Sequence, residues 1–207
     1  MLNKQEVKNI ISSVKEKITD DVKNIVCIVG EIESYPIHIR RDILQTKIKY
    51  IGSKGIVDRI PLQMAEQRNI QLEPGVKYLI IGESRSEDKG DFIRRFLWVN
   101  YIEEVDTEVD YFNFMYLKAY LCKKVGLKFI DNKPVSSAVL CVESSKPHEY
   151  YYIPITAWHR NAIALEKCEE WDIIALQGWV QIKEYVKDGQ NRVGYEMSVK
   201  AITNCDR

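Results

Sequence analysis

Aromatic side chains crowd one short stretch of the chain, "EYYYIPITAWHRNA", residues 149–162. The stretch reads as a β-strand, in which successive side chains point to opposite faces. One face would carry Tyr151, Ile153, Ile155 and Ala157. The other would carry Tyr150, Tyr152, Pro154, Thr156 and Trp158. The first set predicts a core face. The second is aromatic rather than aliphatic, which suits a surface that meets something flat.

A second stretch, "DIIALQGWVQIKEYV" (residues 172–186), repeats this chemistry. Its apolar face would carry Ile174, Leu176, Val180 and Ile182. Its other face would carry Gln177, Trp179, Gln181, Lys183 and Tyr185. Two strands are therefore expected to present aromatic rings interleaved with polar or cationic groups.

The elements that must position these strands follow from hydrophobic periodicity. Residues 4–18 place apolar side chains at spacings of three and four, which predicts an amphipathic helix. Short strand-like runs separated by turns follow at 24–33, 43–52, 55–64, 77–83 and 92–102. A second series follows at 114–121, 135–143, 150–158, 172–186 and 193–202, with a short helix expected at 160–168. Five strands with a helix between the third and fourth describe an OB-fold.

An internal repeat supports two copies of this fold. The order of features in "RIPLQMAEQRNIQLEPGVKYLIIGE" returns in "YIPITAWHRNAIALEKCEEWDIIALQGW". Ile60-Pro61 matches Ile153-Pro154, and Gly82 matches Gly178 after about three extra residues in the second copy. We predict an all-β chain of two tandem five-stranded OB-fold barrels with an N-terminal amphipathic helix. The expected domains are residues 1–106, containing the helix and a diverged barrel, and residues 107–207.

Composition excludes several classes of protein. The 207 residues carry 30 basic and 30 acidic side chains, so net charge alone gives no support for nucleic-acid binding. The sequence has no membrane-length apolar run and no signal-peptide core, which predicts a cytosolic protein. Scattered cysteines without metal-ligand spacing are expected to be reduced structural thiols, and no metal or cofactor is predicted. The five cysteines are Cys27, Cys122, Cys141, Cys168 and Cys205. Phosphate-loop, dinucleotide, zinc-protease and serine-hydrolase motifs are all absent from the sequence, so we predict that the protein is not an enzyme.

The second half resembles the bacterial single-stranded DNA-binding protein (SSB) family. The resemblance is carried by "IPITAWHRNAIALEKCEEWDIIALQGWVQIKEYVKDGQNRVGYEMSV", with its Ala-Trp strand end, Arg-Asn, Leu-Glu-Lys helix and Lys-Asp-Gly-Gln turn. Two departures stand out. Lys118-Ala119 replaces the glycine of the family's first strand, and the chain ends at "AITNCDR" without the family's acidic tail. Recruitment of partners through such a tail is therefore not expected.

Single strands expose the faces of their bases, on which an aromatic ring stacks whatever the base. The resemblance places stacking aromatics at Trp158 and Tyr185, with Tyr152 near another such position. The strand pattern adds Trp179 and Tyr150. Candidates for phosphate contacts are Arg160, Lys183, Lys187 and Arg192. For every aromatic residue the alternative is structural packing, and for every cation it is a solvated surface charge.

The first domain keeps cations but loses aromatics. Aligning the two Ile-Pro pairs places Ala65 opposite Trp158, so one stacking position is missing. The candidate contacts there are Arg40, Arg41, Lys47, Lys49, Tyr50 and Arg59, followed later in the chain by Arg94, Arg95 and Trp98. They could follow a phosphate backbone, or they could form a solvated face, because acidic residues offset them across the domain.

Two functions fit these features. The first is sequence-independent binding of single-stranded DNA in replication, recombination or mobile-element maintenance. RNA is an alternative ligand, because stacking does not read the sugar. The second is a protein-interaction module, such as a primosome or recombination accessory, with weak or no nucleic-acid binding. Because the family's usual assembly holds four copies of the fold, the tandem chain is expected to form a homodimer. Replication or recombination proteins are further candidate partners, and no membrane is expected.

Overall fold

The structure is a computed structural model that describes residues 1–18, 23–52, 55–66, 71–144, 149–187 and 189–206. Within these ranges, the side chains of residues 185–187, 190–192 and 204–206 lie outside the description. The chain forms two compact units. Unit 1 comprises Met1–Ser84 and Phe96–Asn113, and unit 2 comprises Arg85–Arg95 and Phe114–Arg207. The short segment 85–95 thus belongs to unit 2 although its flanks on both sides belong to unit 1.

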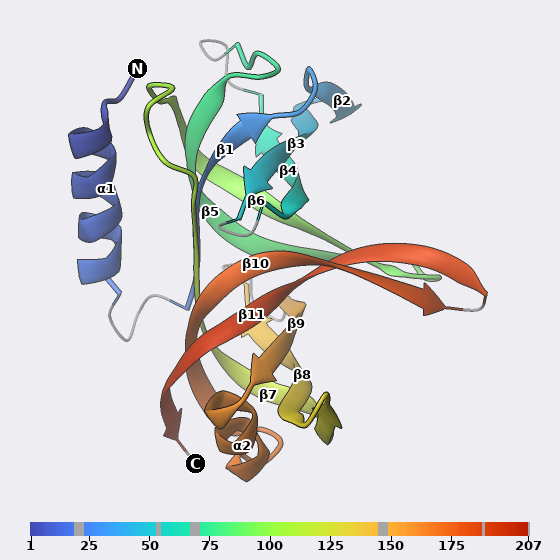
Figure 1. The fold of residues 1–207 in the computed structure, drawn as a ribbon. Coiled ribbons are helices and arrows are strands. Elements are labelled where there is room, and N and C mark those ends of the chain that lie inside the picture. The colour runs from blue at the N-terminus through green and yellow to red at the C-terminus, as the bar shows by residue number, and fades with distance from the viewer. Residues whose placement is uncertain (19–22, 53–54, 67–70, 145–148, 188, 207) are drawn as a thin grey trace. The chain divides into compact units, whose positions relative to one another are not determined.

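Unit 1 is a barrel preceded by a helix (Figure 1). Its elements are α1 (Lys4–Glu16), β1 (Asn24–Ile32), β2 (Ile37–Arg40), β3 (Ile43–Ile51), β4 (Val57–Ala65), β5 (Lys77–Asp88) and β6 (Ile93–Glu104). The sheet runs β1-β5-β6-β4-β3, and pairing between β1 and β3 closes it. β4 and β6 pair in parallel at Leu62 and Leu97. Counting β1, β3, β4, β5 and β6 as first to fifth, this is the strand order of an OB-fold.

The N-terminal helix α1 is capped and tied to unit 1. The Asn3 side chain accepts hydrogen bonds from the Gln5 and Glu6 amides, while Glu6 accepts from the Asn3 amide, which forms a capping box. Leu2 bridges to Val105 in the barrel, and the amphipathic face buries Val7 to 2% exposure. The predicted helix is confirmed, with its end at Glu16. None of the helices in the described residues is long and apolar enough to cross a membrane.

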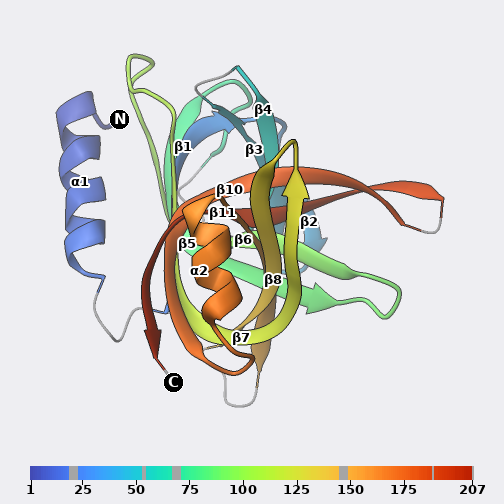
Figure 2. The same cartoon turned by 60° about the horizontal axis from the view of Figure 1, so that its bottom comes forward.

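Unit 2 contains the second barrel. Its elements are β7 (Phe112–Ile130), β8 (Lys133–Glu143), β9 (Tyr150–Trp158), α2 (Arg160–Lys167), β10 (Ile173–Lys187) and β11 (Gln190–Asp206). The sheet runs β10-β11-β9-β8-β7 and closes through β10 and β7, with β9 and β11 parallel. α2 follows the third strand and packs against β8, β9 and β11 (Figure 2). β10 and β11 form a long two-stranded ribbon (Figure 1). The predicted fold, two tandem OB-folds with an N-terminal helix, is confirmed.

The internal repeat is confirmed in detail. Ile60 on β4 and Ile153 on β9 are both fully buried at equivalent positions of nine-residue strands. At Gly82 on β5 and at Gly178 on β10, a backbone carbonyl oxygen lies too close to leave room for a side chain. A Cβ atom at Gly82 would lie 2.1 Å from the Trp98 carbonyl oxygen, and one at Gly178 would lie 2.0 Å from the Ser198 carbonyl oxygen. Both barrels therefore need glycine where the fourth strand crosses the fifth.

Some strands differ from the sequence expectation. β7 continues nine residues beyond the predicted end at Leu121, with bulges at Cys122 and Val125 that change its side-chain alternation. β5 continues through Asp88, although "GESRSEDKG" has the polar composition of a loop. Both extensions form hairpins, whose backbone pairing does not require apolar side chains.

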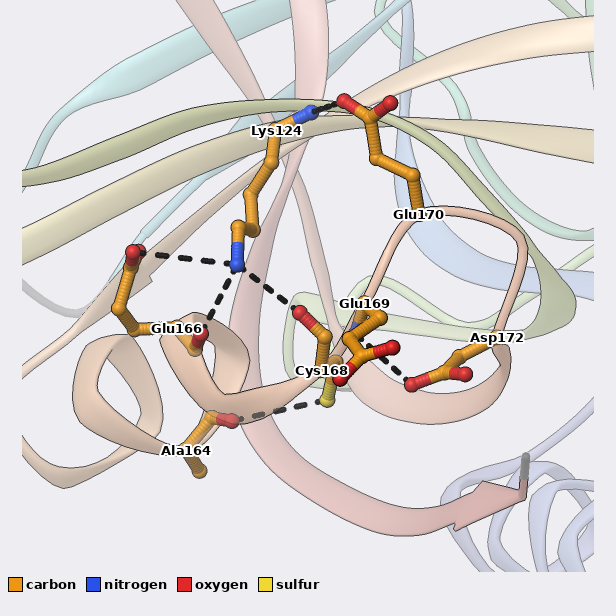
Figure 3. A network of polar contacts seen from close by, with 7 residues as sticks. All are labelled: Lys124, Ala164, Glu166, Cys168, Glu169, Glu170 and Asp172. Atoms are coloured by element: carbon orange, nitrogen blue, oxygen red, sulfur yellow. Dashed lines mark hydrogen bonds and ion pairs between the residues drawn. The ribbon is translucent and has the colours of Figure 1, made fainter.

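The end of α2 is held by a lysine from β7 (Figure 3). Lys124 Nζ donates hydrogen bonds of 2.9 Å to the carbonyl oxygens of Glu166 and Cys168, and its charge lies 3.8 Å from the Glu166 carboxylate. The Lys124 amide also donates to Glu170 at 3.3 Å. A cation at the C-terminus of a helix satisfies unpaired carbonyl groups and opposes the negative end of the helix dipole. This contact fixes α2 against the barrel.

Candidate nucleic-acid interface

The two faces predicted for β9 are largely as expected. Ile153 and Ile155 are buried to 0% and 1% exposure, and the Tyr151 ring is buried beside them. On the other face Tyr150 and Tyr152 remain 40% and 39% exposed. Thr156 departs from this pattern, because it is buried to 3% and lies 3.2 Å from the Ser137 hydroxyl. The exposed part of this face is therefore aromatic.

The pairing register shows which side chains share that face. Across β7, β8 and β9, one row is Tyr120, Cys141 and Tyr152. A second row is Lys128, Val135 and Trp158. Residues in one row point to the same side of a sheet. The outer face of β7, β8 and β9 thus combines Tyr120, Tyr150, Tyr152 and Trp158 with Lys123 and Lys128. We call this set the outer aromatic face.

Tyr120 was missed by the strand pattern. It is 40% exposed and lies in the same row as Tyr152, on the other side of Cys141. The sequence stretch "YLKAYLCKKVGLKF" gives no steady alternation, because the two bulges shift the period. Only the register of β7 against β8 identifies Tyr120 as a member of the face.

Tyr152 is fixed through its backbone as well. Its amide donates to the Ser86 hydroxyl at 2.8 Å, and its carbonyl accepts from Arg95 Nε at 3.1 Å. Both groups therefore point away from β8, so Tyr152 and Cys141 form a non-hydrogen-bonded pair with closely spaced side chains. The neighbouring Cys141 thiol and partial burial raise the pKa of the Tyr152 phenol. The ring stays neutral at physiological pH and does not repel phosphate.

Trp158 and Arg160 lie where β9 passes into α2. Trp158 is half-buried, and Arg160 is the exposed first residue of the helix. Between them His159 has a φ of 55° and donates its amide to the Pro134 carbonyl at 2.8 Å. This bond holds the end of β9 against the start of β8, beside the β7–β8 turn at Asp131 and Asn132. Arg160 thus follows Trp158 by two residues along the chain, with the strained His159 between them.

The β10 candidates continue the outer side of the barrel. Thr156, Ser198 and Trp179 form one row across β9, β11 and β10, and Trp179 is 38% exposed. Lys183 lies two positions beyond Gln181 on the same face. Its ammonium is 3.1 Å from the carboxylate of Glu196, which is itself buried and also accepts from Gln181 at 2.8 Å. Lys183 is therefore partly neutralised within unit 2.

Three candidates have side chains outside the described residues. Tyr185 and Arg192 are partners in the β10–β11 ladder, and Lys187 pairs with Gln190 beside the turn. Their backbone positions place them near the end of this hairpin. Their roles stay predictions.

Exposed apolar groups that the sequence reasoning did not select lie on the β7–β8 hairpin. Phe129 is 68% exposed and Ile130 is 49% exposed. Asp131 and Asn132 both have positive φ, 48° and 61°, as a two-residue type I′ turn requires. The Asp-Asn pair in "FIDNK" was the available signal, since both residues tolerate this conformation. The loop between the first two strands of an OB-fold often contacts oligonucleotides.

Unit 1 carries different chemistry at the equivalent row. Glu31, Lys49 and Arg59 occupy on β1, β3 and β4 the row that Tyr120, Cys141 and Tyr152 occupy in unit 2. Lys49 Nζ lies 2.5 Å from the Glu31 carboxylate, and Arg59 pairs with Glu33. Lys47 lies 3.9 Å from Glu33. The cations predicted to follow a phosphate backbone therefore have carboxylate partners inside unit 1.

Hydrogen bonds determine the charge state of this row. Partial burial raises the pKa of Glu31, but hydrogen bonds from Lys49 and Tyr111 outweigh it, so the net shift is downward. Burial and the bond to Glu31 raise the pKa of Tyr111 to about 12. Tyr50 packs edge-on against the Tyr111 ring, with centroids 6.3 Å apart. Tyr50 is therefore half-buried in a packing contact. Arg40 and Arg41 lie exposed at the turn between β2 and β3.

The cysteines and acidic residues form no metal site in the described part of the chain, where no group of three or more suitable side chains is found. Cys27, Cys122, Cys141 and Cys168 are free thiols. Burial raises the pKa of the Cys27 thiol to about 12. This thiol therefore stays protonated and acts as a small core side chain. The side chain of Cys205 lies outside the described residues.

Solved structures share this architecture. Wild-type single-stranded DNA-binding protein from Thermus aquaticus superposes with a TM-score of 0.72 at 14% identity, covering 89% of this chain and 93% of that one. The chain has that protein's fold. A deletion mutant of the Thermus aquaticus protein gives a TM-score of 0.67 at 13% identity, covering 86% and 92%. No protein-family model and no curated protein sequence matches the chain.

Proposed function

We propose that this chain binds single-stranded DNA without sequence preference and that unit 2 provides the principal binding surface. The outer aromatic face carries the proposal, since Tyr120 and Tyr152 flank one row while Trp158 occupies another. Stacking on such rings contributes about 1–3 kcal/mol per base by alanine substitution and does not depend on base identity. The similarity in fold to the Thermus aquaticus protein, whose name records single-stranded DNA binding, supports the same function.

Cations next to the rings would contact the phosphates. Lys123 and Lys128 lie on the outer aromatic face itself. Arg160 follows Trp158 at the start of α2, and Lys183, Lys187 and Arg192 belong to the β10–β11 hairpin. The β10–β11 hairpin joins the fourth and fifth strands, and the loop at that place is a second recurrent oligonucleotide contact of OB-folds. We infer a path along β9 between the two hairpins of unit 2.

Removing two rings tests this surface. We predict that Tyr152→Ala combined with Trp158→Ala weakens binding of a labelled oligo-dT at least tenfold, because two stacking groups are lost. The control is Trp171→Ala, which removes a 66% exposed tryptophan from the loop after α2. Fluorescence anisotropy of the labelled oligonucleotide measures binding without relying on tryptophan emission. Equal affinities for the double variant and wild type would reject the outer aromatic face as the binding surface.

A protein-interaction module is the second candidate function. The ion pairs of Glu31 with Lys49 and of Glu33 with Arg59 favour it for unit 1, because these cations are neutralised internally. No binding to single-stranded DNA or RNA at low salt, together with co-purification of a replication or recombination protein, would favour this candidate. Competition among DNA, RNA and duplex oligonucleotides for the wild-type chain would also identify the preferred ligand.

We also propose a cytosolic homodimer that presents four OB-folds. The tandem arrangement places two OB-folds in one chain, so two chains together would supply four OB-folds. The expected mass in light scattering is twice the 24.2 kDa of one chain. A mass equal to one chain would reject the dimer without affecting the assigned face. Replication, recombination and mobile-element maintenance are the processes that this activity would serve.

A further inference from the structure

Residues 85–95, "RSEDKGDFIRR", form a compact hairpin tip that belongs to unit 2. The turn has Gly90 at a φ of 82°, and the Lys89 amide donates to the Phe92 carbonyl at 3.0 Å. Gly90 also donates to the Asp88 carboxylate at 2.8 Å. The segment is therefore an ordered hairpin end with its own internal hydrogen bonds.

The tip is fastened to one edge of β9. Within the described residues, β11 pairs with β9 only over Ile155–Ala157, so the earlier part of that edge is left for other groups. Ser86 and Arg95 take this place by bonding the amide and carbonyl of Tyr152 at 2.8 Å and 3.1 Å. The Arg85 guanidinium lies over the Tyr151 ring, 5.7 Å from its centroid. Both ends of the tip thus contact the strand that carries the exposed tyrosines.

The chemistry of the tip repeats that of the outer aromatic face. Phe92 and Ile93 are 48% and 40% exposed. The acidic residues lie toward the turn, where Glu87 pairs with Lys89 at 2.7 Å. Arg94 and Arg95 lie at the other end, where Arg95 donates to the Tyr152 carbonyl. Arginine donates five N–H groups in a fixed planar fork that matches phosphate. The Nε–H group of Arg95 already donates to the Tyr152 carbonyl, so the Arg95 guanidinium is held at a fixed position beside β9.

We propose that residues 85–95 are part of the strand-binding surface of unit 2. A single strand stacked on Tyr150 and Tyr152 continues across the tip, with its phosphates against Arg94 and a further base against Phe92, while Arg95 keeps the tip bonded to Tyr152. This inference rests on the proposed single-strand binding. It adds a segment whose chain neighbours lie in unit 1 to the surface built by β7, β8 and β9. Because the tip is already fastened to β9, little ordering is needed when the strand binds, which favours affinity.

Photochemical crosslinking tests the path directly. An oligo-dT carrying 5-iodouracil is irradiated with the intact wild-type chain, and the crosslinked peptides are identified by mass spectrometry. We expect crosslinks in the peptide containing Tyr150 and Tyr152 and in the peptide containing Phe92. Crosslinks to β9 with none in residues 85–95 would overturn this inference and leave the proposed function standing. An oligonucleotide that does not bind the wild-type chain would reject the proposed function itself.

Variants of the tip give a second measurement. Phe92→Ala with Arg94→Gln should weaken binding of an oligo-dT of about 15 nucleotides about tenfold and that of one of about 5 nucleotides less than twofold, since OB-folds engage about 4–16 nucleotides. The double variant leaves Ser86 and Arg95 in place at Tyr152. Tyr35→Ala with Lys8→Gln is the control, because it removes an exposed ring and a cation from unit 1. Unchanged binding of the long oligonucleotide, or equal losses for both lengths, would overturn the inference.

Discussion

At the residue scale, two glycines show how closely the strands of each barrel cross. A Cβ atom at Gly178 would overlap the Ser198 carbonyl oxygen at 2.0 Å, and this oxygen belongs to the backbone. We predict that Gly178→Ala lowers the free energy of unfolding by about 2–3 kcal/mol, the upper part of the range for overpacking. Relieving the overlap would require β10 and β11 to separate. Urea denaturation measures the change.

Gly52→Ala is the matched control for this substitution. The nearest atom to a Cβ there is 3.6 Å away, which is an ordinary contact. Its unfolding free energy should remain within about 0.5 kcal/mol of wild type, as for most substitutions away from special sites. Equal stability of Gly178→Ala and wild type would show that the β10–β11 crossing is looser than the structure indicates.

At the element scale, Lys124 stabilises α2 from a neighbouring strand. We predict that Lys124→Met lowers the unfolding free energy by about 1–2 kcal/mol, because two carbonyl oxygens lose a charged donor at the end of a helix. The reference is Lys123→Met, which removes an exposed lysine one residue earlier. Thermal unfolding of both variants provides the comparison. A loss of stability as large in Lys123→Met would show that charge on β7, rather than the contact with α2, is responsible.

The elements themselves could be predicted from the sequence more fully than the rows of side chains across them. β4 and β9 share the Ile-Pro pair and a buried isoleucine at the same strand position, so their equivalence was accessible from Ile60 and Ile153. The position of Tyr120 in the same row as Tyr152 could not be predicted, because the register of β7 depends on two bulges that leave no periodic pattern in the sequence. The carboxylate partners of Lys49 and Arg59 were equally inaccessible, since Glu31 and Glu33 come from a strand far earlier in the sequence.

At the scale of the whole molecule, one fold carries two surfaces of different chemistry. The row of Tyr120, Cys141 and Tyr152 in unit 2 corresponds to Glu31, Lys49 and Arg59 in unit 1. The chain has 30 basic and 30 acidic residues, and in this row each cation has a carboxylate partner: Lys49 pairs with Glu31 and Arg59 pairs with Glu33. The carboxylates of unit 1 therefore form ion pairs with the cations that would otherwise be available to a phosphate backbone.

Removing these carboxylates should make unit 1 competent for binding. In Glu31→Gln with Glu33→Gln, Lys47, Lys49 and Arg59 lose their carboxylate partners. We predict tighter binding of single-stranded DNA at low salt. The plot of log affinity against log salt should steepen by about 0.7 for each additional phosphate that the variant neutralises. In wild type the lowered pKa of Glu31 keeps its carboxylate charged at neutral pH, so the internal pairing persists under the conditions of the titration.

A second pair of neutralised carboxylates separates this effect from net charge. Glu16→Gln with Glu108→Gln changes the charge of the chain by the same amount at exposed positions of unit 1. Its salt dependence should match that of wild type, because it frees no cation in the Glu31 row. The same steepening in both double variants would mean that overall charge controls binding. An unchanged slope in both would mean that the unit 1 row does not meet the strand even without its carboxylates, and would leave single-strand binding to unit 2.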